Sequence, residues 1–80
     1  MKTIDAVKLR ILRLCEERNI TINHLATISA LPPSSLKAIL YGRSKNPKLI
    51  TIKILCDGLV ITLGEFFSAP EFDDLEQEIV

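Results

Sequence analysis

The segment ITINHLATISALPPSSLKAILYG, residues 20–42, decides the fold that we expect for this 80-residue chain. Thr21 is a favourable N-cap for a short helix, because its hydroxyl can accept a hydrogen bond from a backbone N–H group of the first turn. After a tight connection, Pro33 suits the first position of a second helix, where its missing N–H group costs nothing. Gly42 then ends that helix. The segment therefore predicts two short helices joined by a three-residue turn, which is a helix-turn-helix layout.

Apolar residues at helical spacing predict three further helices, one before this motif and two after it. Asn19 follows the first helix at a position where asparagine tolerates a left-handed backbone, and Thr62 is the expected cap of the last helix. The five expected helices cover residues 4–18, 22–28, 33–41, 49–59 and 63–68. We expect these residues to point inward: Ile4, Val7, Ile11, Leu14, Leu25, Ala26, Ile28, Leu36, Ile39, Leu40, Leu49, Ile52, Leu55, Cys56, Leu59, Leu63, Phe66 and Phe67. Leu9 and Leu12 widen the apolar face of the first helix. The predicted fold class is all-α.

The composition is that of one small globular domain, since a hydrophobic content of 48% is enough to build a single helical core. Lys8, Arg10 and Arg13 interrupt the apolar residues near the N-terminus, which argues against a signal peptide. No apolar run approaches the ~20 residues that a membrane span needs, so we expect a cytoplasmic protein with no membrane partner. Cys15 and Cys56 are expected to be reduced core residues, and the cysteine and histidine spacing predicts no metal site.

The formal charge of zero hides an uneven distribution. Residues 69–80 carry five acidic residues and no basic one, whereas residues 1–68 carry all ten basic residues and five acidic ones. From Lys37 to Lys53 there are five basic residues and no acidic one. This pattern suits a polyanionic partner, but charge alone leaves an ordinary solvated surface equally open. We therefore divide the chain into a folded domain, residues 1–68, and an acidic tail, residues 69–80.

Several independent motifs resemble those of the Cro/CI-type, or XRE-type, helix-turn-helix regulators. The family's patterns stand here as ITINHLA (residues 20–26), LPPSSLKAI (31–39), NPKL (46–49) and LVITLGEFF (59–67). The resemblance covers roughly residues 7 to 68 without a gap. It implies a five-helix, lambda-repressor-like domain that binds double-stranded DNA and regulates transcription, as a repressor and a homodimer on a two-fold site. No cofactor is implied.

The resemblance also implies which residues touch DNA, because the second helix of the motif lies in the major groove in such domains. The base-facing candidates are Pro33, Ser34, Lys37 and Ala38. Lys37 could donate to guanine O6 and N7, Ser34 could serve several bases, and Ala38 could touch a thymine methyl group. The candidates for phosphate contact are Thr21, Ile22, Tyr41, Arg43, Lys45 and Lys48. An ordinary exposed helix face is the alternative interpretation of Ser34 and Lys37.

Three features depart from the family pattern. Pro32 and Pro33 stand where a capping residue and a Gln or Arg are usual, so we expect DNA shape and phosphate contacts to carry more of the recognition. Cys15 and Leu40 give an apolar contact where some phage repressors have an Arg–Glu pair. Val60 stands where the family favours a left-handed glycine. Valine would be strained in that conformation, so we expect a different local backbone.

The acidic tail carries Phe72, Leu75 and Ile79 at spacings of three and four, which is typical of a short amphipathic helix. Such a helix would pack on the first helix or pair across a dimer, and a frayed end is the open alternative. An acidic tail could also shield the basic face from DNA.

A protein-interaction role on the same fold remains open beside the DNA-binding role. The tail would then grip a protein partner, as in an antitoxin or an anti-repressor. We do not expect an enzyme. His24, the single histidine, belongs to the outer face of its helix, and no catalytic constellation accompanies Ser34 and Ser35.

Overall fold

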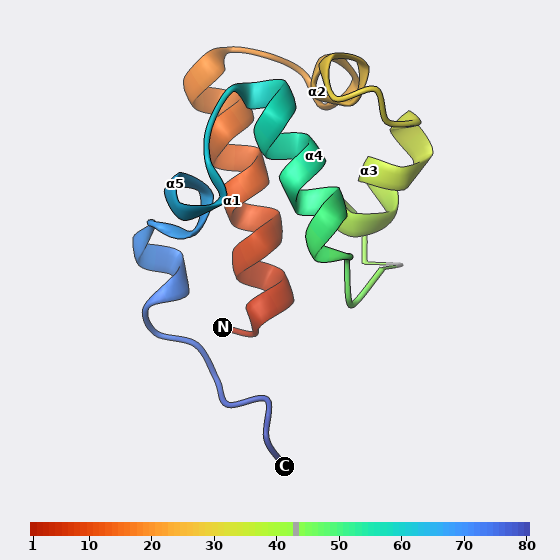
Figure 1. Ribbon diagram of the computed structural model, residues 1–80. Coiled ribbons are helices and arrows are strands. Elements are labelled where there is room, and N and C mark those ends of the chain that lie inside the picture. Colours follow the sequence, from red (N-terminus) through yellow and green to blue (C-terminus); the bar gives the residue numbers. More distant parts are fainter. Residues whose placement is uncertain (43) are drawn as a thin grey trace.

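The computed structural model describes residues 1–42 and 44–80 and shows five α-helices and one short 3-10 helix (Figure 1). The elements are α1 (Thr3–Arg18), α2 (Ile22–Ile28), α3 (Pro33–Leu40), α4 (Leu49–Leu59), α5 (Leu63–Phe67) and η1 (Pro70–Phe72). The described residues form no strand. The predicted all-α, five-helix architecture is therefore confirmed, with each helix boundary within one residue of its expected position.

The helix ends follow from side chains that satisfy free backbone groups. The Thr21 hydroxyl accepts a hydrogen bond from the His24 N–H group at 3.0 Å, as expected of an N-cap. Thr62 and Glu65 form a reciprocal capping box with two hydrogen bonds of 3.0 Å at the start of α5. Asn19 ends α1 with φ 55° and ψ 46°, which is the left-handed conformation predicted for it. Local chemistry thus fixes where three of the helices begin or end.

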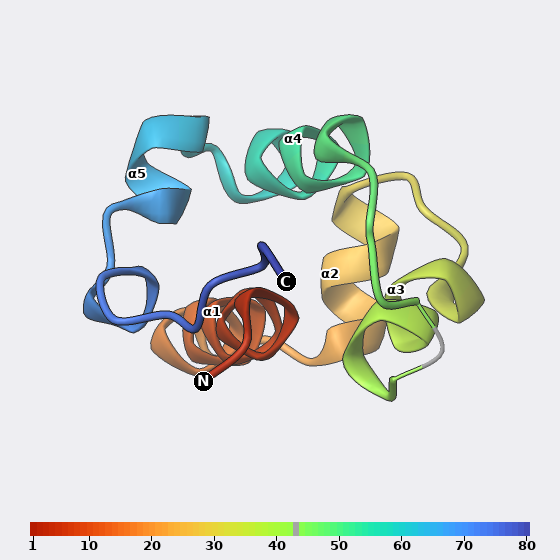
Figure 2. The ribbon, with the colours of Figure 1, turned by 90° about the horizontal axis from the view of Figure 1, so that it is seen from below.

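The core lies where α1, α2, α3, α4 and α5 meet, and each of these helices contributes buried apolar side chains to it. In Figure 2 the helices surround this centre, with α5 and η1 at one side and α3 at the other. Fourteen side chains form the buried cluster: Val7, Ile11, Leu14, Cys15, Leu25, Ala26, Leu36, Ile39, Leu40, Ile52, Leu55, Cys56, Leu59 and Phe66. Cys15 and Leu40, at the positions where some phage repressors have an Arg–Glu pair, both belong to it.

Three residues expected to point inward are exposed instead. Ile28 ends α2, where the next residue, Ser29, is buried in its place. Leu49 is the first residue of α4 and is 59% exposed, because the face that meets the core begins with Ile52. Phe67 is 39% exposed and packs edge-on against Phe66, with ring centroids 4.9 Å apart. All three lie at helix ends. The apolar spacing continues to these residues, but the ends of the helices extend past the core.

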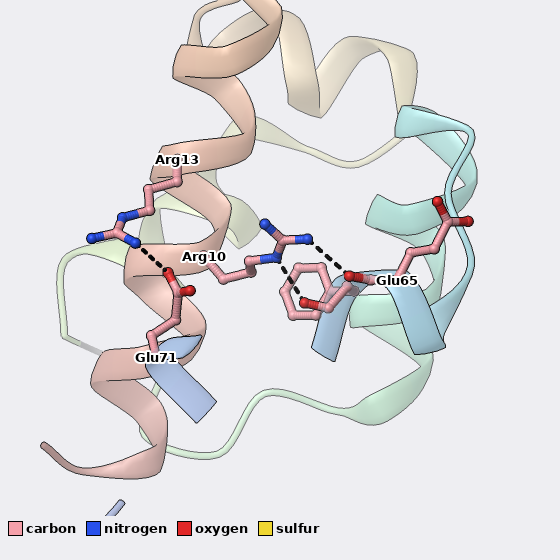
Figure 3. A network of polar contacts seen from close by, with 5 residues as sticks. Arg10, Arg13, Glu65 and Glu71 are labelled. Atoms are coloured by element: carbon pink, nitrogen blue, oxygen red, sulfur yellow. Dashed lines mark hydrogen bonds and ion pairs between the residues drawn. The ribbon is translucent and has the colours of Figure 1, made fainter. Parts of the chain in front are cut away.

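Two arginines of α1 hold the C-terminal part of the fold (Figure 3). The Arg10 Nε and Nη2 groups donate to the backbone carbonyls of Phe66 and Glu65 at 2.7 and 2.8 Å. These carbonyls lie in the last turn of α5, which a cation stabilises. Arg13 Nη1 lies 3.2 Å from Oε2 of Glu71, whose side chain is almost completely buried. Glu71 belongs to η1, so the first residues of the acidic tail pack on α1.

Residues 73–80 follow η1 as irregular chain. Of the amphipathic helix expected over residues 72–79, the structure shows only the 3-10 turn Pro70–Phe72. The Phe72 ring packs against the core beside Phe67, with centroids 5.1 Å apart. Farther along, the Glu76 N–H group donates to the Met1 carbonyl at 3.0 Å.

Val60 corrects the expectation of a changed backbone after α4. It keeps the left-handed conformation, with φ 58° and ψ 46°, although it is a β-branched residue. The hydrogen bond from the Ile61 N–H group to the Cys56 carbonyl, at 2.9 Å, closes the helix end. Because the Val60 side chain is 87% exposed, packing does not compensate the strain of this conformation.

Replacing Val60 with glycine is expected to raise the free energy of unfolding by about 1 kcal/mol. A left-handed conformation costs a non-glycine residue about 1–2 kcal/mol, and part of that gain is offset by the entropy of glycine in the unfolded chain. Urea denaturation of both proteins measures the change. Val60→Ala is the control, since it keeps the Cβ atom and should recover much less. A Val60→Gly protein no more stable than the parent would show that the strain is absent.

Ser29 is a second position at which the fold carries a local cost. Its hydroxyl is buried where α2 approaches α4, and it has no hydrogen-bond partner among residues 1–42 and 44–80. Desolvating an unpaired hydroxyl costs about 1–3 kcal/mol. We therefore expect Ser29→Ala to stabilise the protein by about 1 kcal/mol in thermal or urea denaturation. Ser35→Ala, at an exposed position of α3, is the control and should change stability by less than about 0.5 kcal/mol. Destabilisation by Ser29→Ala would mean that the hydroxyl has a partner.

Candidate nucleic-acid interface

The exposed face of α3 is the centre of the candidate site. Leu36, Ile39 and Leu40 are buried and hold the helix against the core. The opposite face carries the four predicted base-facing residues: Pro33, Ser34 and Lys37, which are exposed, and Ala38, which is half-buried. Figures 1 and 2 both place α3 on one side of the molecule, away from α5 and η1. The fold thus presents this face to solvent without covering it.

The start of α3 has few groups with which to read bases. Pro33 occupies its first turn, and the preceding Pro32 makes no side-chain cap. The Pro32 carbonyl accepts a hydrogen bond from the Ser35 N–H group at 3.0 Å. Ser34 and Lys37 are therefore the only hydrogen-bonding side chains among the four base-facing candidates.

Two predicted phosphate contacts lie at the start of α2. Thr21 is exposed and Ile22 is half-buried. The Thr21 hydroxyl is engaged as the cap of α2 through the His24 N–H group. Phosphate contact here would therefore depend on backbone N–H groups of the first turn, which point along the helix axis.

The other predicted phosphate contacts surround the segment between α3 and α4. Tyr41 caps the C-terminus of α3 and is strongly exposed. Lys48 is exposed at the position before α4. Lys45 is also exposed, and it lines a hollow together with Lys2 and Lys8 from the start of the chain. Arg43, the remaining candidate, lies outside the described residues.

Sequence reasoning did not bring Lys2 and Lys8 into the candidate site. They precede the helix-turn-helix by more than ten residues, and helical periodicity does not predict which loop the start of α1 approaches. The structure places both on the hollow that Lys45 also lines. The positive charge of the loop between α3 and α4 is therefore extended by the N-terminal end of α1.

The remaining reactive side chains belong to the core rather than to a site. Burial raises the pKa of the Cys15 thiol, and it also raises the pKa of the Cys56 thiol. Both cysteines are therefore neutral, reduced core residues, as their sequence context predicted. Within the described part of the chain, no three His, Cys, Asp or Glu side chains are grouped so that they could hold a metal ion. None of the described helices has both the length and the apolar character needed to cross a membrane.

Comparisons with known proteins agree with this geometry. The family described as "Cro/C1-type HTH DNA-binding domain" matches residues 10–71, which run from the middle of α1 through the whole of α2, α3, α4 and α5. A solved structure, described as the crystal structure of the prophage Lp1 protein 11, is similar with a TM-score of 0.80 and 36% sequence identity. The similarity covers 94% of this chain and 100% of that one. The comparison with curated proteins gave no match.

Proposed function

The chain belongs to the Cro/C1-type helix-turn-helix DNA-binding domain family, and from this premise we propose that it represses transcription as a homodimer bound to a two-fold DNA site. The observation that carries the proposal is that α3 is buried on one face and exposed on the other. Three of its residues, Leu36, Ile39 and Leu40, anchor it in the core, while the opposite face stays free for a partner. A helix held in this way can enter the major groove without local rearrangement.

Base recognition is proposed to rest on three side chains of α3. Lys37 donates to guanine O6 and N7, Ser34 donates to or accepts from a base edge, and Ala38 contacts a thymine methyl group. Pro33 offers only apolar surface. Since so few groups can read bases directly, the deformability of the operator contributes to specificity at positions that the protein does not touch.

Phosphate contacts are proposed to supply most of the affinity. Tyr41, Lys45 and Lys48 follow α3 in the chain, and Thr21 and Ile22, at the start of α2, precede it. We propose that Arg43 adds a further phosphate contact. Contacts before and after α3 fix the register of the helix in the groove. A DNA partner is also the reason that we propose a cytoplasmic location and no catalytic role.

Selection of preferred duplexes from a random library tests this function. The homodimer predicts two symmetric half-sites whose centres are about one helical turn, 10 base pairs, apart. The selected duplex is then placed over a reporter promoter, where the protein should lower transcription. Selection without symmetry, or a selected site that leaves the reporter unchanged, would contradict the proposal of a dimeric repressor.

A protein-interaction role, as in an antitoxin or an anti-repressor, is the second candidate function. The observation that favours it is the acidic tail, whose residues Asp73, Asp74, Glu76 and Glu78 are all exposed. Charge reversal at Arg43 and Lys45 separates the two roles. It should abolish DNA binding, whereas a protein partner held by the tail would still be captured.

A further inference from the structure

An open hollow of about 880 Å³ lies at the end of the molecule where α1 begins. Its walls come from the first turns of α1, the segment between α3 and α4, the start of α4 and the end of α5. Five apolar side chains line it: Ile4, Val7, Leu49, Ile52 and Phe67. Leu49 and Phe67 are the two exposed ones, and they account for the apolar surface that the fold leaves uncovered here.

The charged residues around this hollow are mostly basic. Lys2, Lys8 and Lys45 line it, against two acidic residues, Asp5 of α1 and Glu78 of the tail. An occupant that matches this hollow therefore combines an aliphatic side chain with neighbouring carboxylates, because the first covers Leu49 and Phe67 and the second pairs with the lysines.

The acidic tail has this chemistry. Residues 73–80 carry four acidic residues and no basic one, together with the aliphatic residues Leu75, Ile79 and Val80. The tail projects beyond the N-terminal end of α1, away from the core (Figure 1). Contacts of Glu76 with Met1 hold it there, through the backbone hydrogen bond and an ion pair of 3.4 Å with the Met1 amino group.

The tail passes over one side of the hollow of its own chain (Figure 2) but does not fill it. Glu78 reaches the edge, but the next residue, Ile79, is 85% exposed, and Leu49 is 59% exposed. The same molecule therefore presents an unfilled apolar hollow with a basic rim and, projecting from it, an acidic segment with an uncovered aliphatic side chain.

We propose that two copies of this chain exchange their tails, so that Ile79 of each copy enters the hollow of the other between Leu49 and Phe67. Glu78 of the entering tail then faces Lys2 and Lys8 of the lysine rim. Glu76 keeps its contacts with Met1 of its own chain, and Lys45 is left for the proposed phosphate contact. The exchange is reciprocal, so a single two-fold axis satisfies both hollows and closes the assembly at a dimer. This inference rests on the homodimer of the proposed function and names the surface that forms it.

Molar mass in solution tests the exchange without DNA. The full chain, of 9.0 kDa, is measured by sedimentation equilibrium up to about 100 µM, where a dimer with a Kd near 10 µM is mostly formed. We expect about twice the chain mass. Leu49→Glu sets a carboxylate against the acidic tail, and Ile79→Lys sets an ammonium against the lysine rim. Each should weaken dimerisation at least about tenfold. Both sites are exposed, so the variants should keep the helical circular dichroism of the parent.

The double variant Leu49→Glu/Ile79→Lys is the sharpest measurement. It places opposite charges at both proposed contacts, so it should dimerise more strongly than either single variant. Leu12→Glu is the matched control, because Leu12 is an exposed apolar residue of α1 outside the hollow, and it should dimerise like the parent. A parent that stays monomeric, or a dimer that both single variants leave unchanged, overturns the proposal.

Measuring the affinity of the protein for a duplex with a single half-site separates the test of the tail exchange from the test of the proposed function. A monomeric parent that still binds the half-site would overturn only the exchange. A dimer that fulfils all the mass predictions and binds no DNA would overturn only the proposed function.

Discussion

Replacing Gly58 with alanine is expected to lower the free energy of unfolding by about 2–3 kcal/mol, although alanine is the better helix former. Gly58 lies in α4 where the helix crosses the end of α2. A Cβ atom there would lie 2.3 Å from the Ser29 hydroxyl oxygen, 3.1 Å from the Ser29 Cα atom and 3.2 Å from the Ile28 carbonyl oxygen. The hydroxyl can rotate away, but the two backbone atoms can move only if α2 and α4 separate.

The change is measured by urea denaturation with Gly64→Ala as the control. Gly64 also lies in a helix, α5, but the nearest atom to an added Cβ is the Thr62 hydroxyl oxygen at 3.7 Å, an ordinary contact. Gly64→Ala should therefore be neutral or stabilising by up to about 1 kcal/mol. Adding Ser29→Gly to Gly58→Ala removes the nearest side-chain obstacle and should recover part of the loss. Equal stability of the Gly58→Ala and Gly64→Ala proteins would contradict the close packing of α2 on α4.

Replacing Lys37 with glutamine is expected to weaken binding to duplex DNA about tenfold. Lys37 is the only charged side chain among the base-facing candidates of α3. The loss of one well-placed base contact costs about 1–3 kcal/mol, which corresponds to a factor of about five to more than a hundred in affinity. Fluorescence anisotropy of a labelled duplex at fixed salt measures the effect.

Arg13→Gln is the control, because it removes the same charge from the opposite side of the molecule. Arg13 pairs with Glu71 of η1, and Figures 1 and 2 both place η1 away from α3. Because this variant removes the charge that pairs with the buried Glu71 carboxylate, circular dichroism is used to check that it keeps the helical fold. We expect less than a twofold change in DNA affinity. If both variants weakened binding equally, only net charge would matter, and α3 would not be the reading helix.

Local chemistry made most of the fold predictable from sequence. The caps Thr21 and Thr62, the left-handed Asn19 and the proline at the start of α3 each mark a helix end through a short-range rule, and the structure confirms all four. Apolar periodicity identified thirteen of the fourteen residues of the buried cluster and, from its context, the remaining one, Cys15.

Tertiary contacts account for what the sequence did not predict. Periodicity extends a helix face to its last residue, but Ile28, Leu49 and Phe67 lie at helix ends that the core does not reach. Val60 keeps a conformation that its own side chain disfavours, which the surrounding fold must impose. Ser29 is buried where Gly58 of α4 lies against it, and no local sequence pattern predicts that approach.

The candidate site was predictable only as far as the family pattern reaches. The pattern placed Ser34 and Lys37 on the exposed face of α3, as the structure shows. It did not predict the role of Arg10, whose two hydrogen bonds hold α5. A basic side chain on an amphipathic helix is usually solvated, so the sequence offered no reason to expect these contacts. The hollow that Lys45 shares with Lys2 and Lys8 also lies outside the pattern, since it forms between segments distant in sequence.

Salt dependence of binding to a random-sequence duplex tests the central claim, duplex DNA binding by this domain, most directly. The duplex is labelled, and anisotropy is followed at about 50 mM and at about 200 mM salt. If Lys45, Lys48 and the other predicted basic residues contact phosphates, binding releases counterions, and the affinity should fall by about 10² or more between the two conditions. A correctly folded, helical protein that shows no binding at the lower salt concentration would contradict the account.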